Sequence, residues 1–344
     1  MKSAIGVIIV CGLVAGETSA QIVGANVSKS GTTAAAFLEI GVGAPAIGMG
    51  GAYVSVADNA TALYWNAARC ATLQQMDIAV VHTYWIADTK FDYAGIVLPL
   101  GDFGTLGFSL TSLSMSDMKV RTVEMPEGTG EYFSAGDLAG GITYARQLTE
   151  RFAIGLTAKY IQENIWHESA RAFAVDVGTT FRTDLFGGMT IGASLSNFGT
   201  SMTMSGRDTR EFIRLDPSKQ GSNDRIPTSI ELDSWDLPLL LQIGVATRVV
   251  DNDRYRWTFA VDALHPSDNY ESVNVGTQLS FFDLLSVRAG YQSLFLESAE
   301  GGMSFGIGLA SADLLGGMKI GFDYGFQDMG RLESVHVFSL DLRF

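Results

Sequence analysis

From Met76 to the C-terminus, apolar and polar residues alternate with a period of two, the pattern of β-strands with two different faces. The stretch Phe152–Tyr160 reads FAIGLTAKY, and Met318–Phe326 reads MKIGFDYGF. We predict 14 strands, near 76–86, 90–100, 104–113, 137–147, 152–165, 169–182, 188–197, 238–248, 254–264, 269–281, 284–294, 302–311, 316–327 and 333–344.

Strands of this kind suit either a soluble sandwich that buries the apolar face or a membrane barrel that turns it to lipid. Most predicted strands have 10–14 residues, near the 9–11 that a tilted strand needs to cross a bilayer. Their even number is typical of single-chain outer-membrane barrels. Aromatic residues gather near strand ends, as in interfacial girdles: Tyr84, Trp85, Tyr144, Tyr160, Tyr255, Trp257, Tyr291, Tyr324, Phe326 and Phe344. We therefore predict an all-β, 14-stranded antiparallel transmembrane β-barrel, with the sandwich as the alternative.

The lengths of the connections support the barrel. Two long connections, 114–136 and 198–237, follow the third and seventh predicted strands. If both ends of the barrel chain face the periplasm, these odd-numbered connections lie outside the cell. Short periplasmic turns and long outer loops are the expected asymmetry.

The N-terminal quarter does not show the period of two. Residues 1–20 have a positive Lys2, an apolar run and small residues before Gln21, and predict a cleaved export signal. Residues 21–75 are predicted to form an N-terminal extension with a hatch that folds into the lumen as a plug, and 76–344 the barrel. Asp58 is a candidate N-cap for a helix over residues 60–65.

Composition and charge exclude several classes. Although 47% of the residues are hydrophobic, no apolar run reaches 18 residues, which excludes a helical membrane protein. The net charge of −14 gives no basic field for nucleic acid. The four histidines are scattered, only Cys70 would remain after removal of the export signal, and Gly-x-Ser-x-Gly is absent. We expect no enzymatic activity, no metal and no other cofactor.

Seven ionisable residues fall on the polar phase of their strands and are expected to face the lumen: Asp176, Arg182, Asp262, Arg288, Asp323, Asp341 and Arg343. Charges of both signs in a low-dielectric interior are usually paired. We expect these residues to pair with one another or with the hatch, and the alternative is a role in substrate passage or gating.

The stretches Ala34–Gly43 (AAAFLEIGVG) and Ala46–Asn66 (AIGMGGAYVSVADNATALYWN) resemble the N-terminal motif of PorV/PorQ-type proteins, a branch of the FadL-like outer-membrane barrels. The family's usual Trp-Asn-Pro-Ala-Gly is Trp65-Asn66-Ala67-Ala68-Arg69 here, so the end of the hatch helix is expected to differ. The resemblance points to hatch packing, or to ligand or partner contact, by Gly48, Gly50, Gly51, Tyr53, Asp58, Tyr64, Trp65 and Asn66.

The resemblance implies two functions at the bacterial outer membrane. In the first, the protein acts in type IX secretion and binds the C-terminal signal domains of secreted cargo proteins through its outer loops, with Arg207, Arg210 and Arg214, and the acidic Asp208, Glu211 and Asp216, as candidate contacts. In the second, it passes long-chain fatty acids or other apolar solutes, with a pocket formed by Met202, Met204, Phe212, Leu237, Leu239 and Leu240. The lipid of the outer membrane is a partner in both.

Overall fold

The computed structural model describes residues 29, 31–214, 218, 225–296, 299, 301–311 and 318–344. The expected export signal and Asp216 lie outside these residues. No helix among the described residues is long and apolar enough to cross a membrane.

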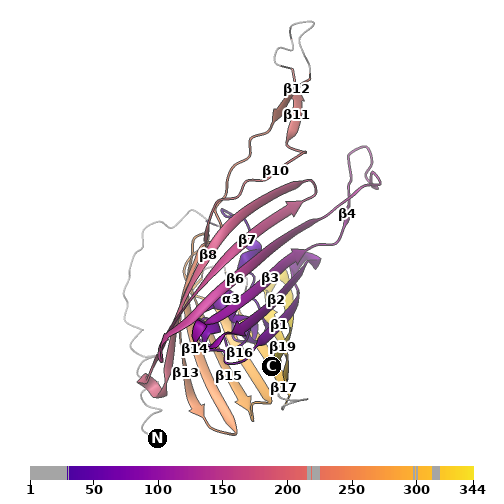
Figure 1. Cartoon of the computed structure of the whole chain (residues 1–344). Helices are drawn as coiled ribbons and strands as arrows, with labels where there is room; N and C mark the ends of the chain where they lie inside the picture. The colour runs from indigo at the N-terminus through magenta and orange to yellow at the C-terminus, as the bar shows by residue number, and fades with distance from the viewer. Residues whose placement is uncertain are drawn as a thin grey trace.

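An antiparallel barrel makes up most of the chain (Figure 1). The ring closes where β1 pairs with β19, from Asp77 opposite Arg343 to Tyr84 opposite His336. Its strands are β1 (Asp77–Tyr84), β2 (Lys90–Pro99), β3 (Thr105–Ser114), β6 (Ala135–Thr149), β7 (Phe152–Ile165), β8 (Glu168–Thr183), β9 (Met189–Gly199), β13 (Leu240–Asp251), β14 (Tyr255–Pro266), β15 (Ser272–Phe281), β16 (Leu285–Leu294), β17 (Met303–Ala310), β18 (Lys319–Asp328) and β19 (Ser334–Arg343). These 14 strands confirm the predicted fold class.

Burial alternates along the strands, because successive side chains point to opposite faces. In β8, Ala170, Ala172 and Ala174 are buried, whereas Phe173 and Val175 between them are exposed. The exposed apolar faces form the outer surface of the barrel, as an outer-membrane barrel requires.

The two ends of the barrel differ. One end carries the short connections 100–104, 150–151, 184–188, 252–254 and 282–284, and we call it the short-turn end. The other, the long-loop end, carries the connections 115–134 and 200–239. They contain β4 (Met118–Lys119), β5 (Tyr132–Phe133), β10 (Ser205–Gly206), β11 (Arg210–Ile213) and β12 (Ile226–Ser229). The β11–β12 hairpin projects well beyond the rim, above the tall wall of β6, β7 and β8 (Figure 1).

Residues 33–73, which we call the hatch segment, lie inside the ring. They form η1 (Ala36–Glu39), α2 (Ala44–Gly48), α3 (Ala62–Trp65) and η2 (Ala67–Thr72), joined by turns. α2 contacts β16, β17, β18 and β19, whereas η2 contacts β3, β6, β7 and β8 on the opposite side. The segment therefore crosses the lumen from wall to wall.

Candidate functional site

Inward-facing glycines of the barrel lie directly against the backbone of the hatch segment. A Cβ atom at six of them would collide with hatch atoms: Gly155 and Gly178 with Ala67, Gly192 with Val54, Gly276 and Gly290 with Met49, and Gly325 with Ala44. At a seventh, Gly306, a Cβ would lie tightly against Gly48, at 3.1 Å. We call these seven glycines the glycine belt. Because the belt spans strands from β7 to β18, the hatch packs tightly against most of the wall.

The predicted hatch glycines allow the same close approach from the other side. A Cβ at Gly48 would lie 2.8 Å from the Cα of Gly306. Gly50 and Gly51 have φ values of 64° and 72°, a left-handed conformation that glycine adopts without strain. The turn after α2 therefore depends on these residues.

The aromatic residues of the motif fix the hatch internally. The indole Nε1 of Trp65 donates to the carbonyl oxygen of Val42 at 2.8 Å, and the Tyr64 hydroxyl donates to that of Leu38 at 3.0 Å. The ring of Tyr53 packs edge-on against Trp65, with centroids 6.0 Å apart. Tyr64 and Trp65 thus join α3 to the segment that precedes α2.

Asn66 joins the hatch to the wall. Its side-chain amide donates to the carbonyl oxygens of Val54 at 2.9 Å and of Thr179 in β8 at 3.0 Å. Its Oδ1 accepts from the amide of Ala68 at 3.1 Å. Asn66 is thus the N-cap of η2, which begins at Ala67, the position where the family usually has proline.

The prediction that Asp58 caps the following helix is wrong. α3 begins at Ala62, its N-cap is Thr61, and no side chain caps it. The amide of Thr61 donates instead to Asn59 Oδ1 at 3.1 Å, and the carbonyl oxygen of Asp58 accepts from Arg343 at 2.9 Å. Asn59, one residue further on, provides the local turn that was expected of Asp58.

Wall carboxylates bind polar groups of the hatch. Asp262 accepts from the amide of Val54 at 2.9 Å, and Asp341 accepts from the Asn59 side chain at 2.8 Å. Asp77, which the sequence analysis did not single out, accepts from the amide of Ala60 at 2.8 Å. These contacts satisfy hatch donors that would otherwise be buried without a partner.

Most of the other predicted lumen charges form ion pairs within the wall. Arg288 lies 2.5 Å from Asp323, and Lys159 lies 2.6 Å from Asp176. Arg343 lies 2.7 Å from Asp77. The remaining predicted residue, Arg182, lines a cavity described below.

The half of the lumen toward the long-loop end is apolar. On the hatch side Phe37, Leu38 and Ile40 are buried there, and the wall contributes Phe91 and Ile161, both with no exposed surface. Two inward-facing wall residues, Tyr93 and Asp77, were not singled out from the sequence. They could have been predicted to face the lumen, because each lies at a position of its strand whose side chain points inward.

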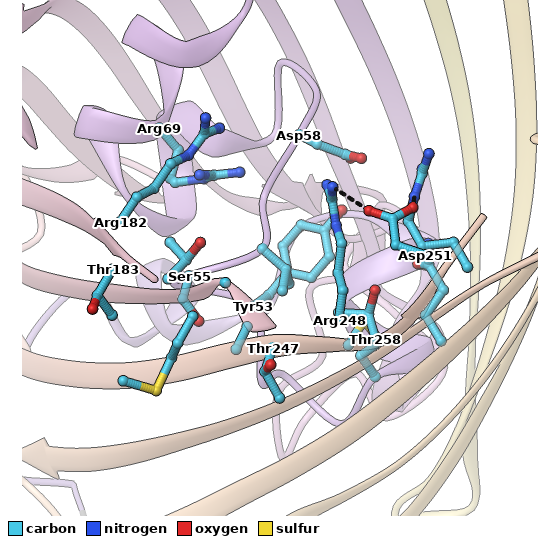
Figure 2. A pocket seen from close by; sticks show the side chains of 18 of the residues that line it. Tyr53, Ser55, Asp58, Arg69, Arg182, Thr183, Thr247, Arg248, Asp251 and Thr258 are labelled. Carbon is cyan, nitrogen blue, oxygen red and sulfur yellow. Dashed lines mark hydrogen bonds and ion pairs between the residues drawn. The ribbon is translucent and has the colours of Figure 1, made fainter. Parts of the chain in front are cut away.

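The half toward the short-turn end is polar, and its cavities include two that are lined by predicted lumen charges. One, of about 340 Å³, lies between η2, β8 and β13 and is lined by Tyr53, Ser55, Asp58, Arg69, Arg182, Arg248 and Asp251, among others (Figure 2). The other, of about 590 Å³, is lined by Arg288, Asp323, Asp341 and Arg343, among others. Among the described residues, no group of three or more His, Cys, Asp or Glu is placed to hold a metal ion.

The apolar residues predicted to form a pocket at the long-loop end are only partly brought together. Met202 and Leu237 are buried in the apolar cluster, and Met204 packs against it. Leu239 and Leu240 are half-buried, whereas Phe212 on the projecting hairpin is 68% exposed. A groove of about 350 Å³ borders Met202, Met204 and Trp235.

The predicted outer-loop residues lie on or near the projecting hairpin. Arg207 donates to the ring of His167 at 2.8 Å, and Arg210 is exposed at the start of β11. A hydrogen bond from His167 lowers the pKa of Asp208, to which it lies 2.8 Å away. Arg214 follows the end of β11.

The hatch also meets a connection at the long-loop end. The Thr33 hydroxyl donates to Asp268, between β14 and β15, at 2.8 Å. Burial, and then the neighbouring carboxylate of Asp268, raise the pKa of Glu39 from 4.5 to about 7. Glu39 and Asp268 thus form a carboxyl pair that favours a proton on Glu39.

Comparisons with known proteins agree with this architecture. The chain is similar in fold to the toluene transporter TbuX of Ralstonia pickettii (TM-score 0.53, 11% identity, 88% of this chain and 98% of that chain). It is likewise similar to the toluene transporter TodX of Pseudomonas putida (TM-score 0.52, 15% identity, 88% and 97%) and to a Pseudomonas aeruginosa FadL homologue (TM-score 0.50, 12% identity, 88% and 98%). No curated protein matches the sequence.

A family model gives a more specific match. The model for the type IX secretion system protein PorV matches residues 24–224, which include the hatch segment, the strands from β1 to β9 and most of the projecting hairpin region. A barrel of this kind is an outer-membrane protein. The chain belongs to the PorV family.

Proposed function

We propose that the protein is a non-enzymatic component of type IX secretion that binds the C-terminal signal domains of secreted cargo at the long-loop end of the barrel. The observation that carries this proposal is the match to the PorV family model over residues 24–224. The matched range contains both the hatch segment and β11, so it covers the parts that distinguish this chain from a plain barrel.

The geometry favours contact outside the lumen over passage of a polypeptide through it. The hatch segment packs against the glycine belt and binds wall carboxylates on several strands. The cavities at the short-turn end share no lining residue with the groove at the long-loop end. Cargo that approaches from the cell exterior would therefore meet the projecting hairpin of β11 and β12 first.

A photo-crosslinking amino acid at Arg210 tests this proposal in cells that secrete such cargo. We expect capture of proteins that carry C-terminal signal domains. The matched control is the same amino acid at Leu185, which is exposed at the short-turn end and is expected to capture no cargo. Equal capture at both positions, or none at Arg210, would contradict the proposal.

Transport of apolar solutes is the second candidate function. The groove beside Met202, Met204 and Trp235 supports it, because an apolar groove near the rim is a suitable first binding site for such a solute. Comparing uptake of a labelled long-chain fatty acid in deletion and complemented cells decides the matter. Equal uptake in the two strains would eliminate transport.

A further inference from the structure

Two arginines differ from the other basic side chains of the lumen. Lys159, Arg288 and Arg343 each lie between 2.5 and 2.7 Å from a carboxylate oxygen. Arg248 and Arg256 share Asp251, each at 3.1 Å. Among the described residues, neither Arg69 nor Arg182 forms an ion pair, although both line the 340 Å³ cavity.

Arg69 is held rigidly at this cavity. It lies in η2 with only 7% of its surface exposed, and its Nε donates to the carbonyl oxygen of Ala57 at 2.9 Å. That bond fixes the plane of the guanidinium, whose two terminal nitrogens have no protein acceptor among the described residues. Neither terminal nitrogen is a fully buried atom without a partner, so both reach the cavity, where water or a bound anion can accept from them.

Arg182 brings a second guanidinium to the same place. It is an exposed residue near the end of β8, with the same parity as Gly178 and Thr180. Its side chain lines the same cavity, and in the view of Figure 2 its guanidinium points toward that of Arg69. Burial lowers the pKa of Arg69, and the nearby positive charges of Arg182 and Arg248 lower it further. The two arginines thus repel each other in the structure as it stands.

The acidic residues around the cavity do not neutralise this pair. Asp251 is shared by Arg248 and Arg256, and Asp184 lies 2.6 Å from Arg151. Asp58 also lines the cavity and attracts Arg69 electrostatically, but it forms no ion pair with it. Asp58 thus offsets part of the charge of Arg69, and the four arginines that line this open, polar cavity still outnumber its three aspartates.

We infer that Arg69 and Arg182 form a binding site for a small oxyanion, a phosphate or carboxylate group, that enters from the short-turn end. Two adjacent guanidinium groups present forked N–H donors that match the oxygens of either group. The hydroxyl of Thr183 lines the same cavity and provides a further donor, because in the structure its oxygen only accepts, from the amide of Leu185. The volume of about 340 Å³ suits a small organic anion better than a single halide.

The site is independent of the proposed role in secretion. It lies at the end of the barrel opposite to the projecting hairpin, and short turns face the periplasm in bacterial outer-membrane barrels. The ligand is therefore expected to come from the periplasmic side, as a free anion or as an acidic group of a larger molecule.

Calorimetric titration of the purified full-length protein in detergent tests this inference. Inorganic phosphate and succinate are the two probes, at constant ionic strength set with sodium chloride. We expect saturable binding of at least one probe. Which probe binds shows whether the site accepts a phosphate or a carboxylate group. No saturable binding of either probe would overturn the inference.

Three variants identify the site. We expect Arg182→Gln to weaken binding at least about tenfold, because one of the two forks is lost. Arg69→Lys keeps the charge but loses the fork, so it should weaken binding as well. Arg254→Gln removes an equal charge from the exposed turn 252–254 outside the cavity, and it should bind like the unchanged protein.

Heat-modifiable mobility on gels shows that each variant is folded before titration. If Arg254→Gln weakens binding as much as Arg182→Gln, the affinity for the anion depends on the net charge of the protein alone, and the inference of a site at Arg69 and Arg182 is wrong. If Arg182→Gln does not fold, Arg69→Lys against Arg254→Gln decides by the same criterion.

Discussion

The two halves of the lumen share one ring of strands but are filled in different ways. Toward the long-loop end, buried apolar side chains such as Leu38, Phe91 and Ile161 pack against one another. Toward the short-turn end, ion pairs such as Arg288–Asp323 line cavities of about 340 and 590 Å³. The hatch segment, against which the glycine belt packs, borders both halves.

The two halves therefore differ in how they hold the hatch and in what they can admit. The apolar half holds the hatch by packing, which depends on shape. A polar half admits water and small ions, and it holds the hatch by hydrogen bonds to carboxylates such as Asp262 and Asp341. The polar lining therefore makes the short-turn half the better place for water and small ions, whereas the apolar half mainly holds the hatch.

Breaking an ion pair in the polar half has the largest expected effect. Arg288→Met leaves Asp323 buried without its partner at 2.5 Å, and we expect a loss of about 3 kcal/mol in the free energy of unfolding. Urea unfolding in detergent micelles, followed by tryptophan fluorescence, measures it. The double variant Arg288→Met, Asp323→Leu should recover most of the loss. A double variant no more stable than the single one would show that the pair contributes more than mutual neutralisation.

The second largest loss of stability is expected from adding a methyl group where the glycine belt contacts the hatch. In Gly178→Ala the new methyl would meet Asn66 and the backbone of Ala67, and we expect a loss of about 2 kcal/mol because the hatch must shift. Gly140→Ala is the matched control, since a Cβ at this position of β6 meets no atom within 4 Å. The same urea unfolding applies. Similar losses in both variants would mean that strand propensity, and not hatch packing, accounts for the glycines.

Removing one methyl from the apolar half has a smaller effect. Ile161→Val is expected to cost about 1 kcal/mol, because Ile161 is fully buried between the hatch and the wall. Ile142→Val on the lipid-facing side of β6, which is 59% exposed, should cost much less. If both changes lower the free energy of unfolding equally, the half of the lumen toward the long-loop end is packed no better than the surface that faces detergent or lipid.

The smallest expected effect is a pH dependence at the long-loop rim. The pKa of Glu39 is raised to about 7 in the folded protein against 4.5, so the folded state binds more protons in this window. Its stability contribution is then full below pH 4.5 and falls as pH rises toward 7. Because Glu39 is exposed, solvent screening reduces the effect of this shift, and we expect hydrogen exchange at residues 33–40, corrected for its intrinsic pH dependence, to be only roughly threefold more protected at pH 5 than at pH 8. In Glu39→Gln this difference should vanish, and its persistence would assign it to another group.

The sequence identified the barrel because its determinants are local. Alternation such as that of Phe152–Tyr160 specifies a strand with one apolar face, and the connection lengths fix which end carries the long loops. The helix cap was mispredicted at Asp58 because caps depend on the dihedral angles of one or two residues, and here Asn59 binds Thr61 instead. Arg69 was not singled out, since nothing in its neighbourhood in the sequence shows that its side chain reaches a cavity.

By itself, the sequence determined the class of fold, the number of strands and the position of the long loops, because the period of two and the turn residues act over a few positions. Only the tertiary structure decided which glycines form the belt, which carboxylate accepts from which hatch donor, and that Arg69 meets Arg182. Most of these contacts join residues more than a hundred positions apart in the chain, as do Arg69 and Arg182 at one cavity, and they depend on how the ring closes around the hatch. A shift of one residue in strand register would turn each inward side chain outward. The wall–hatch contacts therefore depend on the register of the whole ring, which no local sequence pattern specifies.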